Sequence, residues 1–195
     1  MPVPITITKI PFFAAADIPG FVLKGFVSLL IGPLGEERSS LARTIAADWI
    51  EAGIPTLYLQ AGAESRFSFS DIAMQCAMYE RKCGSPLGGL VIDCWEEAAS
   101  ERYFNSHFLD MRLAFLKLKV FAFERQMRVL LVGLDRSKPG DPPRPRPFLP
   151  FMAYEAKTVM AMGKDAAGKP QATVWQGQMR RWEKGLTVCL SLAQG

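Results

Sequence analysis

Four short apolar segments that alternate with longer helix-like segments constrain the fold of this chain more than any other feature. The apolar segments are residues 26–31, 56–60, 88–94 and 128–133. Between them, Ser39 or Ser40 is a suitable N-cap for a helix that ends at Gly53, and residues 70–82 and about 107–126 also suit helices. Strands that alternate with helices in this way predict a parallel sheet covered by helices on both faces.

The sequence changes character after Asp135. Residues 137–150 contain six prolines and cannot form regular structure. Short strands are then expected at 157–162, 172–176 and 186–192, with a turn at 165–168 between the first two. We therefore expect a three-layer α/β fold with a mostly parallel central sheet and an antiparallel C-terminal extension. A lead-in at 1–25 would precede one domain at 26–195, and 137–150 would form a basic, proline-rich loop within it.

Composition narrows the class of protein. With 195 residues, 49% hydrophobic and 22% charged, the chain resembles an ordinary soluble protein with one core. No stretch approaches the roughly 18 apolar residues of a membrane helix, and residues 1–13 lack the features of a secretory signal. We therefore expect a cytoplasmic protein without a membrane span.

Histidine and cysteine are too scarce and too scattered for several kinds of chemistry. His107 is the single histidine, and the four cysteines form no C-x-x-C pair. We therefore expect no metal site, and the Ser-His and Cys-His hydrolases are disfavoured. A net charge of +4 is compatible with nucleic acid or with an acidic protein partner and selects neither.

The segment after the first apolar run has the frame of a phosphate-binding loop. A functional loop reads G-x-x-x-x-G-K-[ST]: its backbone N–H groups hold the phosphates, its lysine reaches the β- and γ-oxygens and its hydroxyl holds Mg²⁺. Here Gly32, Gly35 and Ser39 fit that frame, but Glu37 replaces the second obligatory glycine and Arg38 replaces the lysine. The candidate phosphate-loop residues are thus Gly32, Gly35, Arg38 and Ser39.

Two carboxylates make this loop a poor triphosphate site. Glu36 and Glu37 would lie where phosphate oxygens belong, and a left-handed backbone at Glu37 would add strain of roughly 1–3 kcal/mol. The simpler interpretation is a strand–turn–helix junction with no ligand. We expect no cofactor, with ATP and Mg²⁺ as the alternative if the loop still binds.

With the loop placed, about residues 10–192 resemble the RecA-like ATPase domains of the DnaB and RepA replicative-helicase type, with a degenerate Walker A motif. Segments that carry the resemblance follow one another in the family's order: Phe13–Pro19 with Leu29–Gly35, Leu90–Trp95, Phe115–Gln126, Val129–Arg136 and Thr158–Leu192. The resemblance implies that Asp93 is the Walker B aspartate and that Arg180 and Arg181 lie near the arginine-finger position.

The chain departs from that family at several catalytic positions. The family's catalytic glutamate matches Gly62, and only a shifted alignment would bring in Glu64; the lysine that accompanies the arginine finger is Met179. Asp93 and Glu64 remain the catalytic candidates. Asp93 could hold Mg²⁺ or could be a polar residue at the sheet edge. Together with the altered loop, these departures favour a pseudo-ATPase, a motor fold without its chemistry, over an enzyme.

Two basic segments are candidate interfaces for DNA or a protein partner. The proline-rich segment contributes Arg136, Lys138, Arg144 and Arg146, and the tail contributes Trp175, Arg180, Arg181 and Trp182. The simpler alternative for the proline-rich segment is a surface loop without a partner. For the tail, the simpler alternative is that its aromatic side chains pack on the sheet. The segment 108–123 is apolar on nearly every side, so we expect it to be buried, with contact to another protein as the alternative.

Two functions remain open. In the first, a helicase-like but non-hydrolytic regulator docks on a DNA motor ATPase, such as a replicative helicase or the conjugative machinery of a plasmid, or assembles with itself. In the second, an atypical ATPase acts on single-stranded DNA, with Arg38 in place of the lysine and Glu64 as base.

Overall fold

A seven-stranded sheet in the order β2-β3-β4-β1-β5-β6-β7 organises the chain. The computed structural model describes residues 22–33, 36–60, 68–93, 106–134, 152, 155–164, 167–168, 170–178 and 181–189. The strands are β1 (Val27–Gly32), β2 (Thr56–Gln60), β3 (Gly89–Asp93), β4 (Arg128–Leu134), β5 (Thr158–Lys164), β6 (Pro170–Gln178) and β7 (Arg181–Cys189). β2, β3, β4, β1 and β5 pair in parallel, and β6 and β7 continue the sheet antiparallel.

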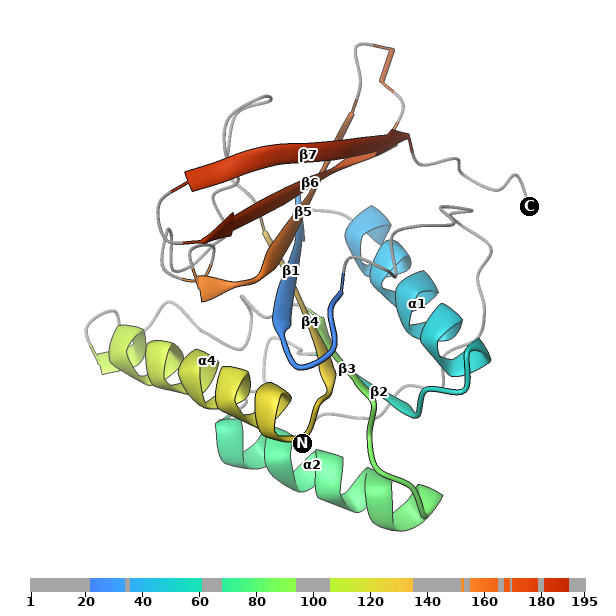
Figure 1. Cartoon of the computed structure of the whole chain (residues 1–195), viewed down its shortest axis with the longest axis vertical. Coiled ribbons are helices and arrows are strands. Elements are labelled where there is room, and N and C mark those ends of the chain that lie inside the picture. Colours follow the sequence, from blue (N-terminus) through green and yellow to red (C-terminus); the bar gives the residue numbers. More distant parts are fainter. Residues whose placement is uncertain are drawn as a thin grey trace.

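Helices cover both faces of this sheet (Figure 1). Helix α1 (Glu36–Glu51) packs on one face, where Leu41 and Ile45 join Leu30 of β1 in a buried cluster. Helices α2 (Phe69–Cys83) and α4 (Ser106–Glu124) pack on the other face, where Ile72 and Phe115 are buried. The expected three-layer α/β architecture with an antiparallel C-terminal extension is confirmed.

The start of α1 differs from the expectation. Ser39 and Ser40 were expected to cap the helix, but α1 begins at Glu36, so both serines lie in its first turns. Glu37 is therefore helical and carries no left-handed strain; Gln126, with φ 52°, is the non-glycine residue of the described chain with a positive φ. Residues 33–35 alone connect β1 to α1. The expected cap is wrong because the helix already begins at Glu36, three residues before Ser39, whose hydroxyl has a partner described below.

Two other elements also differ from the sequence prediction. β7 begins at Arg181 rather than at 186, because its polar first half pairs with β6 through the backbone: Arg181 lies opposite Gln178 and Trp182 opposite Gly177. Helix α4 is not buried all round, since Val120 and Phe123 are exposed.

The described end of the predicted lead-in packs on this core. Val22 is buried in the α1-side cluster, and the Gly25 N–H donates to the Met127 carbonyl at 3.0 Å. Both contacts precede β1, so the chain is already held against the sheet before its first strand begins. The division into a lead-in and one domain stays a prediction.

Candidate functional site

Asp93 and Ser39 meet at the carboxyl edge of the parallel sheet. Asp93 is the last residue of β3, and Ser39 lies in the first turns of α1, which follows β1. The Ser39 hydroxyl donates to Asp93 Oδ1 at 3.1 Å, and Asp93 has no exposed surface. The predicted Walker B position and the predicted loop hydroxyl are therefore brought together, although 54 residues separate them in sequence.

Tyr58 takes the second oxygen of the same carboxylate. Its side chain extends from β2 toward the α1 side of the sheet, and its hydroxyl donates to Asp93 Oδ2 at 2.6 Å. Burial raises the pKa of Tyr58 strongly, and the negative charge of Asp93 together with this hydrogen bond raises it further; the neighbouring Arg43 guanidinium offsets part of the rise. Tyr58 is therefore a neutral donor at every physiological pH, and Asp93 has both carboxylate oxygens engaged inside the protein.

The residues at the lysine and glycine positions of the loop lie in different surroundings. Arg38, at the lysine position, is buried with 4% of its surface exposed. Glu37, at the position of the second glycine, is exposed and lies 3.8 Å from the Lys164 ammonium of β5. The carboxylate at the glycine position thus forms an ion pair with Lys164 at the surface, and such exposed pairs contribute little to stability.

Gly32 has a packing role that does not involve a phosphate. A Cβ at this position would lie 3.0 Å from Cβ of Met162, which belongs to the neighbouring strand β5. The glycine lets β1 and β5 approach where β1 ends. Conformational freedom for phosphate binding is therefore not the only reason for a glycine at the start of the loop.

The remaining predicted site residues fall outside what the structure describes, wholly or in their side chains. Gly35, Glu64, Arg136, Lys138, Arg144, Arg146 and Arg180 lie outside the described residues. Trp175 lies in β6, and Arg181 and Trp182 begin β7, but only their backbone positions are described. The proposed basic interfaces therefore remain predictions.

Mg²⁺ with ATP fits the residue types at this edge only in part. A serine hydroxyl beside an aspartate is the pair that holds Mg²⁺ in phosphate-loop enzymes. However, Asp93 is fully buried and already accepts from two hydroxyls, and a buried arginine stands where a lysine would reach the β- and γ-oxygens. Among the described residues of this site, the lysine position is thus held by a guanidinium, whose planar geometry differs from that of the lysine ammonium.

Sequence reasoning missed Tyr58 and Arg43. Tyr58 lies within an apolar strand, where sequence reasoning predicts a core residue. It is also two residues before Gln60, and Gln60 lies directly opposite Asp93 on the neighbouring strand. Its side chain and that of Asp93 therefore point to the same face of adjacent strands. A buried tyrosine hydroxyl needs a partner, so the signal in the sequence was the tyrosine itself inside an apolar strand, whereas its partner follows from the register of the two strands in the structure.

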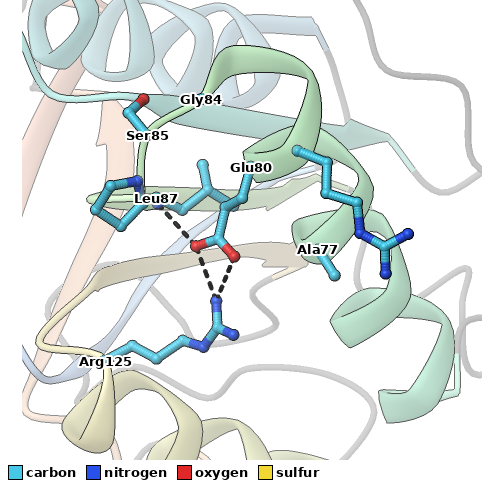
Figure 2. Close-up of a pocket in the computed structure, with 8 residues that line it drawn as sticks. Ala77, Glu80, Gly84, Ser85, Leu87 and Arg125 are labelled. Carbon is cyan, nitrogen blue, oxygen red and sulfur yellow. Dashed lines mark hydrogen bonds and ion pairs between the residues drawn. The ribbon is translucent and has the colours of Figure 1, made fainter.

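A cavity of about 610 Å³ lies at the opposite edge of the sheet, where β3 and β4 begin (Figure 2). Arg125 binds both oxygens of the Glu80 carboxylate at 2.8 Å, and the Leu87 N–H donates to Glu80 Oε1 at 2.9 Å. Burial alone would raise the pKa of Glu80, but the Leu87 N–H and the Arg125 guanidinium outweigh it and lower this pKa. These contacts connect α2 to the segments before β3 and β4. The charged residues of the cavity wall therefore stabilise the packing of these segments.

Membrane-spanning helices and clusters of metal-binding side chains were also sought among the described residues. Among the described helices, none is long and apolar enough to cross a membrane. Within the same part of the chain, no three His, Cys, Asp or Glu side chains gather in a group that could hold a metal ion.

The chain was also compared with known proteins. No protein-family model matches the sequence, and no curated protein gives a match. Among solved structures, a KaiC-like protein from the hyperthermophilic archaeon Pyrococcus horikoshii matches with a TM-score of 0.55 and 15% identity, over 98% of this chain and 100% of that one. The fold is RecA-like. At this identity the likeness establishes the fold alone, and the DnaB and RepA resemblance stays an inference from sequence.

Proposed function

We propose that this chain is a non-hydrolytic RecA-like protein that regulates a DNA motor ATPase by docking on it. The observation that carries the first half of the proposal is the state of Asp93. Its two carboxylate oxygens accept from Ser39 and Tyr58, and the carboxylate is fully buried. In this arrangement the aspartate stabilises the junction of β2, β3 and α1.

Chemistry at the loop supports the same conclusion. Phosphoryl transfer needs cations and N–H donors placed around the transferred group. Here a carboxylate stands at the glycine position, and the buried Arg38 stands at the lysine position. The guanidinium of arginine is planar and spreads its charge over several N–H groups, whereas the lysine ammonium is a compact charge. Arginine therefore does not replace lysine in a phosphate loop shaped for an ammonium group.

The docking half of the proposal rests on the fold and on the resemblance to replicative helicases. Motors of that type are rings of RecA-like subunits, so a RecA-like protein without hydrolysis could occupy or block a subunit's position. Two basic segments are the candidate contacts for the motor or its DNA. They are the proline-rich segment, Arg136 to Arg146, and the tail, Trp175 to Trp182. Interference with the replication or transfer of a plasmid is the setting that this resemblance suggests.

One observation favours the second candidate, an atypical ATPase acting on single-stranded DNA. The 3.1 Å bond between Ser39 and Asp93 keeps together two groups that hold Mg²⁺ in active enzymes. In that case Arg38 would contact the phosphates, and Glu64 would act as base.

Nucleotide titration separates the two candidates. The purified full chain is titrated with a fluorescent ATP analogue and Mg²⁺, and the regulator predicts no saturable binding below about 1 mM. Micromolar binding that Arg38→Ala weakens would favour the ATPase. Lys82→Ala serves as the matched control, because it also removes one cation but lies in the last turn of α2, away from the loop.

A further inference from the structure

In the cavity where β3 and β4 begin, the ion pair between Glu80 and Arg125 leaves one edge of the arginine unused. Both bonds to Glu80, each 2.8 Å long, start from the same terminal nitrogen, Nη1. Nε and Nη2 donate to no acceptor among the residues that the structure describes. Figure 2 shows one terminal nitrogen on the carboxylate and the other directed away from it. Nε and Nη2 form an edge with two parallel N–H groups, which matches a carboxylate or a phosphate.

Arg125 is held in place, so this edge needs little ordering before it binds. Its guanidinium lies 4.6 Å from the centroid of the Phe121 ring, and Nη1 is fixed by Glu80. Glu80 in turn accepts from the Leu87 N–H at 2.9 Å. The Arg125 side chain is still 39% exposed, so a ligand can reach it. A group that is already ordered loses less conformational entropy when it binds a ligand.

The charged residues that line the cavity favour an anionic ligand. They are two cations, Arg81 and Arg125, and one anion, Glu80. Arg125 already binds both oxygens of Glu80, whereas Arg81, in the last turn of α2, has no ion-pair partner within the described part of the chain. The charged groups that remain unused are therefore N–H donors, which a ligand with acceptor oxygens and negative charge complements.

Helices α2 and α4 both end beside this cavity, and an uncapped carbonyl end would oppose an anion. After α2, the Gly84 N–H donates to the Glu80 carbonyl at 2.8 Å, and after α4, the Met127 N–H donates to the Ala122 carbonyl at 2.9 Å. These bonds satisfy part of each carbonyl end, and Arg81 places a positive charge in the last turn of α2. The helix ends therefore do not cancel the positive charge of the cavity wall.

The size of the cavity and its apolar wall indicate an organic ligand. Its volume of about 610 Å³ lies in the range of small-molecule sites and exceeds what a bare phosphate ion would fill. Ala77, Pro86 and Leu87 add apolar surface beside the charged residues. A ligand that fills this space carries an apolar group in addition to its anionic group.

We propose that this cavity binds a small organic anion, a carboxylate or phosphate joined to a compact apolar group. Its oxygens would accept from the Nε and Nη2 groups of Arg125 and from the guanidinium of Arg81, and its apolar part would contact Ala77 and Leu87. The cavity lies at the opposite edge of the sheet from Asp93, so this inference goes beyond the proposed function and does not rest on it.

The test is a heteronuclear NMR titration of the full chain with phenyl phosphate, benzoate and uncharged benzyl alcohol. At least one of the two anions should bind with a Kd below about 1 mM and shift the amide signals of Ala77, Gly84 and Leu87, and benzyl alcohol should bind at least about tenfold more weakly. Tighter binding of phenyl phosphate would identify phosphate as the anionic group of the ligand, and tighter binding of benzoate would identify carboxylate.

Variants of the cavity wall locate the binding. Arg125→Lys keeps a positive charge opposite Glu80 but lacks the Nε–Nη2 edge, so it should weaken anion binding by about tenfold or more. Ala77→Leu fills the cavity without changing a charge, should have a similar effect, and repeats the test if Arg125→Lys fails to fold. Arg81→Ala should weaken binding by about threefold. Lys82→Ala is its matched control, because Lys82 is in the same helical turn but does not line the cavity.

No binding of either anion below about 1 mM, equal binding of benzyl alcohol, or anion binding that survives both Arg125→Lys and Ala77→Leu would overturn the proposal. Equal losses in Lys82→Ala and Arg81→Ala would also overturn it, because they indicate unspecific attraction to surface charge. A loss in Arg38→Ala that is absent from Arg125→Lys would place the anion at the loop after β1 and overturn the proposal as well.

Discussion

The Tyr58 hydroxyl lies 2.6 Å from Asp93 Oδ2, and the two side chains come from adjacent parallel strands. Asp93 is fully buried and Tyr58 is 2% exposed, so the bond forms away from water. With Ser39 on the other oxygen, the carboxylate at the end of β3 accepts hydrogen bonds from two other elements, β2 and α1. This relationship connects the fold to the proposed loss of hydrolysis, because it gives Asp93 a structural role.

Removing the Tyr58 hydroxyl should destabilise the protein. Tyr58→Phe keeps the ring in the core but leaves a buried carboxylate oxygen without this donor. The free energy of unfolding should fall by about 1.5–3 kcal/mol, as for other hydrogen bonds to charged groups. Urea denaturation followed by circular dichroism measures this change, with Tyr79→Phe as a control at a partly buried tyrosine on α2. Equal, small losses in both variants would contradict the role of the bond.

The same contact predicts a pH dependence. Because the folded protein raises the pKa of Tyr58, its contribution to stability is complete below about pH 10, the ordinary tyrosine pKa, and is lost as the pH rises beyond it. The stability difference between wild type and Tyr58→Phe should therefore shrink above about pH 10, by up to about 1.4 kcal/mol per pH unit. A difference that stays constant from pH 8 to about pH 11 would show that the tyrosine is not buried against Asp93.

Gly32 tests whether the loop glycine serves packing or phosphate binding. Gly32→Ala should lower the free energy of unfolding by about 1–3 kcal/mol without any nucleotide, because the new Cβ would lie 3.0 Å from Cβ of Met162. Gly163→Ala on β5 is the matched control, since a Cβ there meets nothing within 4 Å. If Gly32→Ala is as stable as wild type, the glycine has no packing role.

Two cysteines should differ sharply in reactivity. Burial raises the pKa of the Cys76 thiol to about 12, whereas Cys83 at the end of α2 is exposed. Thiolate is the reactive form, so native protein at pH 8 should be alkylated at Cys83 and protected at Cys76 until it unfolds. Mass spectrometry of iodoacetamide-treated peptides measures both sites in one sample. Labelling of Cys76 at the rate of Cys83 would contradict the packing of α2 on the sheet.

Much of the fold was accessible from sequence because its strands are short apolar runs between clear breaks. β2 was predicted with the correct ends, and β1, β3 and β4 to within one residue. The start of α1 was wrong because a serine before an apolar run resembles a cap, whereas Ser39 bonds to Asp93 across the sheet. Only the tertiary structure reveals a partner that distant in sequence.

The candidate site was predictable only where a motif named it. Gly32, Ser39 and Asp93 follow from the frame of the loop and the end of a strand. Tyr58 follows from neither, because its role depends on the register of β2 against β3. Likewise, the apolar character of α4 was visible in sequence, but which side chains face the core depends on how the helix lies on the sheet, so the expectation of complete burial was wrong at Val120.

The measurement that tests the central claim most directly is phosphate release from ATP by the purified full chain, with Mg²⁺ and with or without single-stranded DNA. The account predicts the same background release for wild type and for Asp93→Ala, with circular dichroism confirming that each is folded. Mg²⁺-dependent release that exceeds the background and disappears in Asp93→Ala would contradict it, and would establish this RecA-like chain as a working ATPase.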